Sequence, residues 1–101
     1  MKYFSIWQYE VVKGKEKLFE QIYGPEGDWV RLFEQGIGYC RTTLIRNRSQ
    51  NSVYVTIDEW ESLEKYREFH QKYKERYGEI DQLCSELTVS EVHLGEYESV
   101  A

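Results

Sequence analysis

Hydrophobic side chains follow two different periods along the chain. Aromatic and β-branched residues mixed with single polar ones predict four strands, over Tyr3–Val12, Ile37–Arg46, Ser52–Trp60 and Thr88–Tyr97. Between the first and second strands, and again between the third and fourth, apolar residues recur every three or four positions, which is typical of helices with one buried face. The predicted order of elements is βαββαβ.

The second helical region has the clearer pattern. Ser62 stands where an N-cap is expected, and apolar residues then repeat at Leu63, Tyr66, Phe69, Tyr73 and Tyr77. We expect Gly78 to interrupt this helix before a second helical stretch. The first region likewise reads as a helix over Lys15–Tyr23, a break at Gly24-Pro25-Glu26-Gly27, and a second segment from Asp28.

This order favours a ferredoxin-like α+β fold, with one four-stranded antiparallel sheet and both helical regions on the same face. The strands are apolar on both sides, since Phe4 and Ile6 point one way from the first strand while Tyr3, Trp7 and Tyr9 point the other way. Because helices would cover one face only, we expect a second copy of the chain to cover the other in a homodimer with twofold symmetry.

Composition narrows the class of protein. A length of 101 residues indicates a single domain over 1–101. A net charge of -5 disfavours nucleic acid and anionic membranes as partners. The N-terminal segment has no long apolar run, so we expect a cytoplasmic protein without a signal peptide. Cys40 and Cys84 have no metal or redox spacing and are interpreted as reduced, buried fillers.

Several short motifs together resemble the antibiotic biosynthesis monooxygenase (ABM) family. They are Val12–Lys15 after the first strand, Phe19-Glu20 on the first helix, Gly36–Tyr39 before the second strand, and Ile57–Ser62 from the third strand into the second helical region. The resemblance spans nearly the whole chain. It implies a dimeric α+β barrel, in which two protomers pack their sheets face to face, and a ligand cleft in each protomer between sheet and helices.

The resemblance also implies a chemistry. Some members of this group oxidise quinols or polyketide phenols with dioxygen and without a metal or organic cofactor, so we expect a cofactor-independent monooxygenase whose partner is a small aromatic molecule. Other members degrade haem and carry Asn, Trp and His at positions that read Trp7, Phe69 and Glu79 here. Haem degradation is therefore disfavoured.

Such an oxygenase needs a base and an aromatic, mostly dry cavity. His70, at the edge of the apolar helix stripe, is the predicted catalytic base; the alternative is a boundary histidine with one polar contact. Trp60 and Tyr66 are predicted to bind substrate at the cleft mouth, or else to belong to the core. Tyr39 and Arg41 are predicted to share a strand face, where Arg41 pairs with a phenolate, or else with a surface carboxylate.

The remaining polar pairs are interpreted conservatively. Asp58 and Glu59 are neighbours on a strand and must point to opposite faces, so they cannot cooperate. Glu91 and His93 share a face, but two ligands do not make a zinc or iron site. Because no compelling catalytic constellation is present, a non-catalytic homodimer that binds or senses a small molecule stays open as an alternative.

Overall fold

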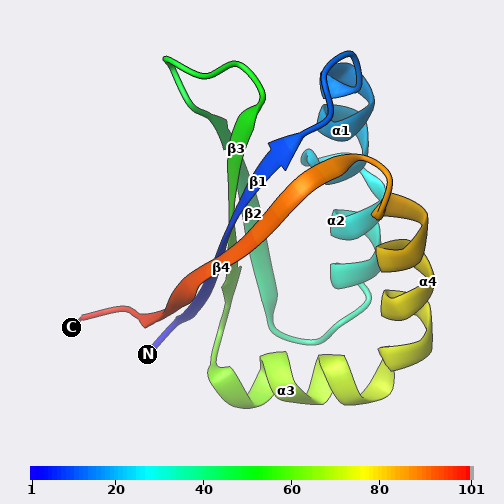
Figure 1. Ribbon diagram of the computed structural model, residues 1–101. Coiled ribbons are helices and arrows are strands. Elements are labelled where there is room, and N and C mark those ends of the chain that lie inside the picture. Colours follow the sequence, from blue (N-terminus) through cyan, green and yellow to red (C-terminus); the bar gives the residue numbers. More distant parts are fainter. Residues whose placement is uncertain (101) are drawn as a thin grey trace.

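The computed structural model describes residues 1–100. It contains one antiparallel sheet, which helices cover on one face (Figure 1). The strands are β1 (Tyr3–Val11), β2 (Tyr39–Arg46), β3 (Val53–Trp60) and β4 (Thr88–Glu98), in the order β2-β3-β1-β4. The helices are α1 (Glu16–Tyr23), α2 (Asp28–Phe33), α3 (Leu63–Lys72) and α4 (Lys74–Cys84). The predicted ferredoxin-like βαββαβ fold is confirmed.

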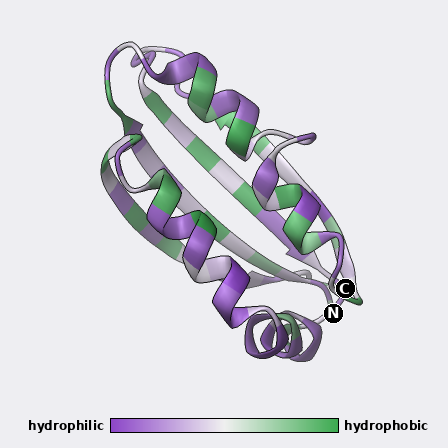
Figure 2. Ribbon diagram, turned by 90° about the vertical axis from the view of Figure 1, so that its right-hand side faces the viewer, coloured by the Kyte–Doolittle hydropathy of each residue, from purple (hydrophilic) through white to green (hydrophobic). Residues whose placement is uncertain are grey.

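Strand alternation separates two faces of the sheet. On β3, Tyr54, Thr56 and Trp60 are buried under the helices, whereas Val55 and Ile57 lie on the opposite face. Figure 2 shows the same alternation of hydrophobic and hydrophilic residues along the strands. The side chains of one face therefore pack against the helices, and those of the other face do not.

The break in the second helical region lies at Tyr73, and the prediction that Gly78 interrupts the helix is wrong. Tyr73 has φ -110° and ψ 25°, and its N–H closes α3 by donating to the carbonyl of Phe69 at 2.9 Å. Gly78 lies inside α4. The spacing could not reveal the bend because Tyr73 keeps its place in the apolar series.

Within residues 1–100, no helix is long and apolar enough to cross a bilayer.

The sheet face away from the helices is apolar and uncovered (Figure 1). Three of its residues, Ile45, Val92 and Tyr97, are 47–51% exposed. Together with the half-buried residues of β1 and β3 they form what we call the outer face, whose apolar members are Phe4, Ile6, Ile45, Val53, Val55, Ile57, Val92 and Tyr97.

Two glycines explain the motif before β2. A Cβ on Gly36 would lie 2.7 Å from Cδ1 of Phe69, so only glycine lets this turn approach the core. Gly38 has φ +95°, and a Cβ there would lie 2.7 Å from Cβ of Lys65. Backbone conformation and space both require glycine at position 38.

Substituting Gly38→Ala should lower the free energy of unfolding by about 1–3 kcal/mol, the cost of a side chain at positive φ. Gly78→Ala is the matched control, because a Cβ there meets nothing within 4 Å and alanine should stabilise an exposed helix position by about 0.5–1 kcal/mol. Chemical denaturation of both variants checks the pair. Equal effects of the two substitutions would contradict the described geometry.

Candidate functional site

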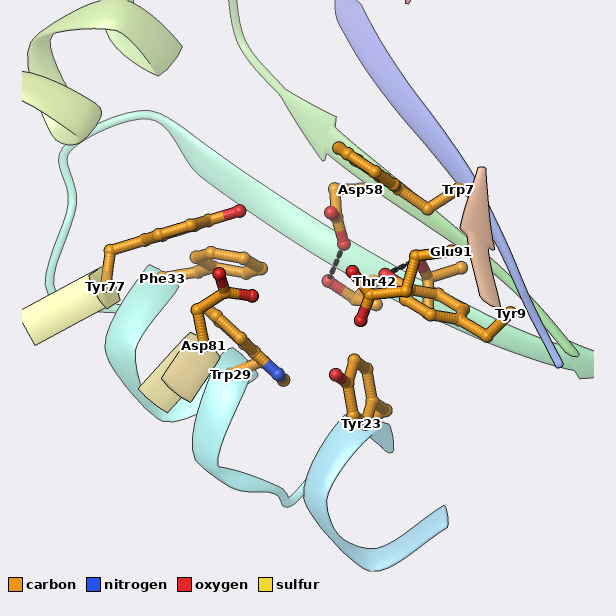
Figure 3. A pocket seen from close by; sticks show the side chains of 11 residues that line it. Trp7, Tyr9, Tyr23, Trp29, Phe33, Thr42, Asp58, Tyr77, Asp81 and Glu91 are labelled. Carbon is orange, nitrogen blue, oxygen red and sulfur yellow. Dashed lines mark hydrogen bonds between the residues drawn. The ribbon is translucent and has the colours of Figure 1, made fainter. Parts of the chain in front are cut away.

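A cavity of about 240 Å³ lies between the helix-covered face of the sheet and the helices α1, α2 and α4 (Figure 3). Its lining residues are Trp7, Tyr9, Tyr23, Trp29, Phe33, Thr42, Thr56, Asp58, Tyr77, Asp81 and Glu91. Only Asp81 on α4 and Glu91 on β4 are exposed members of this set, so the cavity opens between those two elements. A shallow hollow on the surface beside the cavity is also lined by Asp81 and Glu91.

Asp58 brings a carboxyl group from β3 to the sheet side of the cavity. Its Oδ1 accepts a hydrogen bond from Oγ1 of Thr42 at 2.8 Å, and the Tyr39 hydroxyl donates to the same Thr42 oxygen at 2.8 Å. Burial disfavours the charged form and raises the pKa of Asp58 to about 6, a rise that the Thr42 hydrogen bond opposes. At neutral pH this carboxylate is ionised and is a stronger base than an ordinary one.

Aromatic rings make most of the cavity wall. The rings of Trp29 and Tyr77 lie 4.8 Å apart between centroids, and those of Trp29 and Phe33 lie 5.9 Å apart. Burial raises the pKa of the Tyr9, Tyr23 and Tyr77 hydroxyls. These groups therefore stay protonated and can donate hydrogen bonds to a ligand.

Charge in the cavity has one sign. Asp58, Asp81 and Glu91 contribute three carboxyl groups, and none of the described lining residues is Lys, Arg or His. Partial burial, and secondarily the negative charge of Asp81, raise the pKa of Glu91. The arrangement can accept protons and hydrogen bonds, and it favours a ligand that supplies donors or positive charge.

The predicted base, His70, lies outside this lining. Its ring packs between Tyr66 and Tyr77, at centroid distances of 4.3 and 4.7 Å. Burial lowers the pKa of His70, which favours the neutral imidazole. The contact with Tyr77 links His70 to the cavity wall, and the catalytic role of His70 stays a prediction.

The three predicted aromatic binding residues lie behind the cavity. Trp60 has no exposed surface and packs edge-on against Tyr39 and Tyr66, at centroid distances of 5.3 and 5.9 Å. Tyr39 reaches the site indirectly, through its hydrogen bond to Thr42. Burial raises the pKa of Tyr39 to about 12, so its hydroxyl stays a donor.

The prediction that Tyr39 and Arg41 share a face is wrong. The pairing of β2 with β3 is irregular between them, so that Tyr39 opposes Trp60 while Arg41 opposes Glu59. The extra residue reverses the alternation. Arg41 consequently lies on the outer face, where its Nη1 is 2.9 Å from Oε1 of Glu59.

The interpretation of the neighbouring acids is confirmed. Glu59 points to the outer face and also pairs with Lys2 at 2.8 Å, while Asp58 points into the cavity. Glu91 and His93 share the helix-covered face: Glu91 lines the cavity, and the His93 ring stacks on Trp7 at 4.5 Å. Residues 1–100 contain no cluster of three or more His, Cys, Asp or Glu able to hold a metal.

Solved structures share this architecture. SnoaB from Streptomyces nogalater, described as a cofactor-independent oxygenase, aligns with a TM-score of 0.76 at 19% identity, over 99% of this chain and 94% of that chain. A candidate antibiotic biosynthesis monooxygenase from Bordetella bronchiseptica aligns with a TM-score of 0.74 at 18% identity, over 99% and 98% of the two chains. The chain has the fold of these two proteins.

A third protein with the ABM fold, from Deinococcus radiodurans, aligns with a TM-score of 0.73 at 12% identity, over 98% of this chain and 93% of that chain. No protein-family model and no curated protein sequence matches the chain. The likeness therefore shows the fold, and the chemistry has to be argued from the cavity of this chain.

Replacing Asp58 by Asn should raise the free energy of unfolding at pH 7 by about 1–3 kcal/mol. The folded state raises the pKa of Asp58 from 3.8 to about 6, so ionisation of Asp58 weakens the fold as pH rises through this window and costs most above it. The amide removes that cost and keeps an acceptor for Thr42. At pH 4 the gain should be much smaller.

Thermal and urea unfolding of wild type and variant at both pH values check this. Glu86→Gln is the control, because it removes one charge at an exposed position and should change stability by no more than about 0.5 kcal/mol. If the variant is destabilised equally at pH 4 and pH 7, burial of the ionised Asp58 carboxylate does not destabilise the fold, and the prediction is wrong.

Proposed function

We propose that this chain is a cofactor-independent monooxygenase that acts on a quinol or phenolic aromatic molecule bound in the cavity. The observation that carries the proposal is the carboxyl group of Asp58, which has a raised pKa and accepts a hydrogen bond from Thr42 while facing a space walled by aromatic rings. A desolvated base beside an aromatic substrate is the minimum that such a reaction requires.

Proton removal is the step that the protein assists. Asp58 accepts the proton of a phenolic hydroxyl, and the resulting electron-rich anion reacts with dioxygen. One oxygen atom becomes a carbonyl oxygen on the substrate and the other leaves as water, so the substrate supplies both reducing equivalents. The likeness of the fold to SnoaB, described as a cofactor-independent oxygenase, supports this class of reaction.

The hydrogen bonds behind Asp58 give it a defined orientation. Tyr39 donates to Thr42, and Thr42 donates to Asp58, which leaves the second carboxylate oxygen available to the cavity. Tyr39 is therefore a positioning residue in this proposal. His70 contacts the ring of Tyr77 and so supports the cavity wall. In this proposal the base is Asp58, whereas the sequence suggested His70.

Oxygen uptake by purified protein with a panel of quinols tests the reaction. We expect Asp58→Asn to lower turnover by about 10²-fold or more, the usual scale for loss of a general base, while the fold is retained. His70→Ala should cost about 1 kcal/mol of stability, as for a typical point substitution, and leave turnover within about tenfold.

If His70→Ala instead lowers turnover by about 10²-fold while Asp58→Asn keeps it, His70 is the catalytic base and Asp58 is not. Thermal unfolding of both variants is measured in parallel, so that lost activity is not confused with lost structure. No oxygen uptake with any quinol would favour the alternative, a non-catalytic protein that binds or senses a small molecule. The observation behind that alternative is the absence of any cation among the described lining residues.

We further propose that two copies pair through the outer face, as expected for a dimeric α+β barrel. The apolar residues of this face are exposed or half-buried in the single chain, and a second copy would remove them from water. Glu59 is already paired with Lys2 and Arg41, so its carboxylate keeps positive partners when a second copy covers it.

Analytical ultracentrifugation at micromolar concentration should show a species of about twice the 12.2 kDa chain mass. Val55→Lys places an unpaired charge on the outer face and should dissociate or unfold the dimer, because burying such a charge costs several kcal/mol. Gln71→Lys, at an exposed position of α3, is the control and should leave the mass unchanged. A monomeric wild type contradicts the proposal.

A further inference from the structure

The carboxyl groups of the cavity have no positive partner. The ion pairs among the described residues involve four other acids, which are Glu20, Glu59, Glu68 and Glu79. Asp58 accepts only the Thr42 hydroxyl, and Glu91 has a long contact of 3.4 Å with the Thr88 hydroxyl. Three carboxyl groups thus face one small space without a counter-charge.

The mouth carries two of these acids on different elements. Asp81 comes from α4 and Glu91 from β4, and both are exposed where the cavity opens. Figure 3 shows Asp81 next to Phe33 and Trp29, and Glu91 next to Thr42 and Tyr9. Like charges so placed repel each other, and a cation between them relieves the repulsion.

The walls favour the same kind of ligand. Faces of Trp and Tyr rings attract cations through their quadrupoles, and Trp7, Trp29 and Tyr77 all line the cavity. The indole Nε1 of Trp29 is buried and lies beside the Cys84 thiol, so Trp29 contributes its ring to the cavity wall. The residue as a whole is only 7% exposed.

The proposed reaction adds a further reason, and this inference rests on that proposal for the place where the ligand lies. A phenol that loses its proton becomes an anion, and no lining Lys, Arg or His stabilises it. A positive group on the ligand itself would neutralise that charge and pair with the acids at the mouth.

We infer that the cavity selects aromatic molecules that carry a protonated amine, with the ammonium group between Asp81 and Glu91 and the ring between Trp29, Phe33 and Tyr77. The volume of about 240 Å³ lies just below the usual range for small-molecule pockets, about 300–1,000 Å³. It limits the enclosed part of the ligand to one or two rings.

Three phenols that share one ring and differ in charge test the inference: tyramine as the cation, 4-ethylphenol as the neutral analogue and 3-(4-hydroxyphenyl)propionate as the anion. Binding is measured by calorimetry on the full chain at pH 7, without any requirement for turnover. We expect tyramine to bind at least about tenfold more tightly than 4-ethylphenol, and the anion to bind more weakly than both.

The double variant Asp81→Asn, Glu91→Gln should abolish the preference for tyramine over 4-ethylphenol. Glu75→Gln with Glu86→Gln is the matched control, because it removes the same two charges from exposed positions outside the cavity lining. The control should keep the full preference. These four positions are exposed, so the variants should fold.

Equal or weaker binding of tyramine relative to 4-ethylphenol overturns the inference, as does a preference that survives in the double variant or failure of all three probes to bind at millimolar concentration. Oxygen uptake is measured separately. Tight tyramine binding without uptake by any quinol would reject the monooxygenase and keep the ligand class, whereas uptake without cation preference would do the reverse.

Discussion

A continuous layer of aromatic rings between the sheet and the helices is the constraint on which the rest of the structure depends. Ring contacts run from Tyr54 through Phe19, Tyr23, Trp29 and Phe33 to Trp60, with neighbouring centroids between 4.1 and 6.0 Å apart. The cavity adjoins this layer, because Tyr23, Trp29 and Phe33 belong to the layer and also line the cavity.

Much of the fold could be predicted from the sequence because strand alternation and helical spacing are local properties. The faces assigned to β1 and β3 are correct for this reason. Errors arose where a backbone irregularity left no local mark: the bend at Tyr73 keeps the apolar spacing, and the extra residue before Arg41 reverses the alternation only through pairing with β3. Both features depend on distant parts of the chain.

The site was harder to predict than the fold. His70, Trp60 and Tyr66 were selected for their place on the helix stripe or at its start, and they lie beside the cavity instead of in its lining. A usable signal was present, since Asp58 shares the inward face of β3 with Tyr54 and Trp60. An acid at such a position has to be either paired or functional.

The positions of Asp58 and Glu59 correctly exclude cooperation between the two acids, but they do not reveal that Asp58 lines the cavity. Asp81 and Glu91 could not be found from spacing at all. They come from separate elements, and only the packing of α4 beside β4 places them at one opening.

The short connection between α4 and β4 holds one end of α4 beside the mouth of the cavity. Leu87 in this connection is buried, and its carbonyl accepts a hydrogen bond from the N–H of Val12 at 2.9 Å, while its own N–H donates to Cys84 at 3.0 Å. The end of α4 next to β4 is thereby fastened to the sheet. The two acids at the mouth, Asp81 before this connection and Glu91 after it, are therefore carried by a segment that is tied to the end of β1.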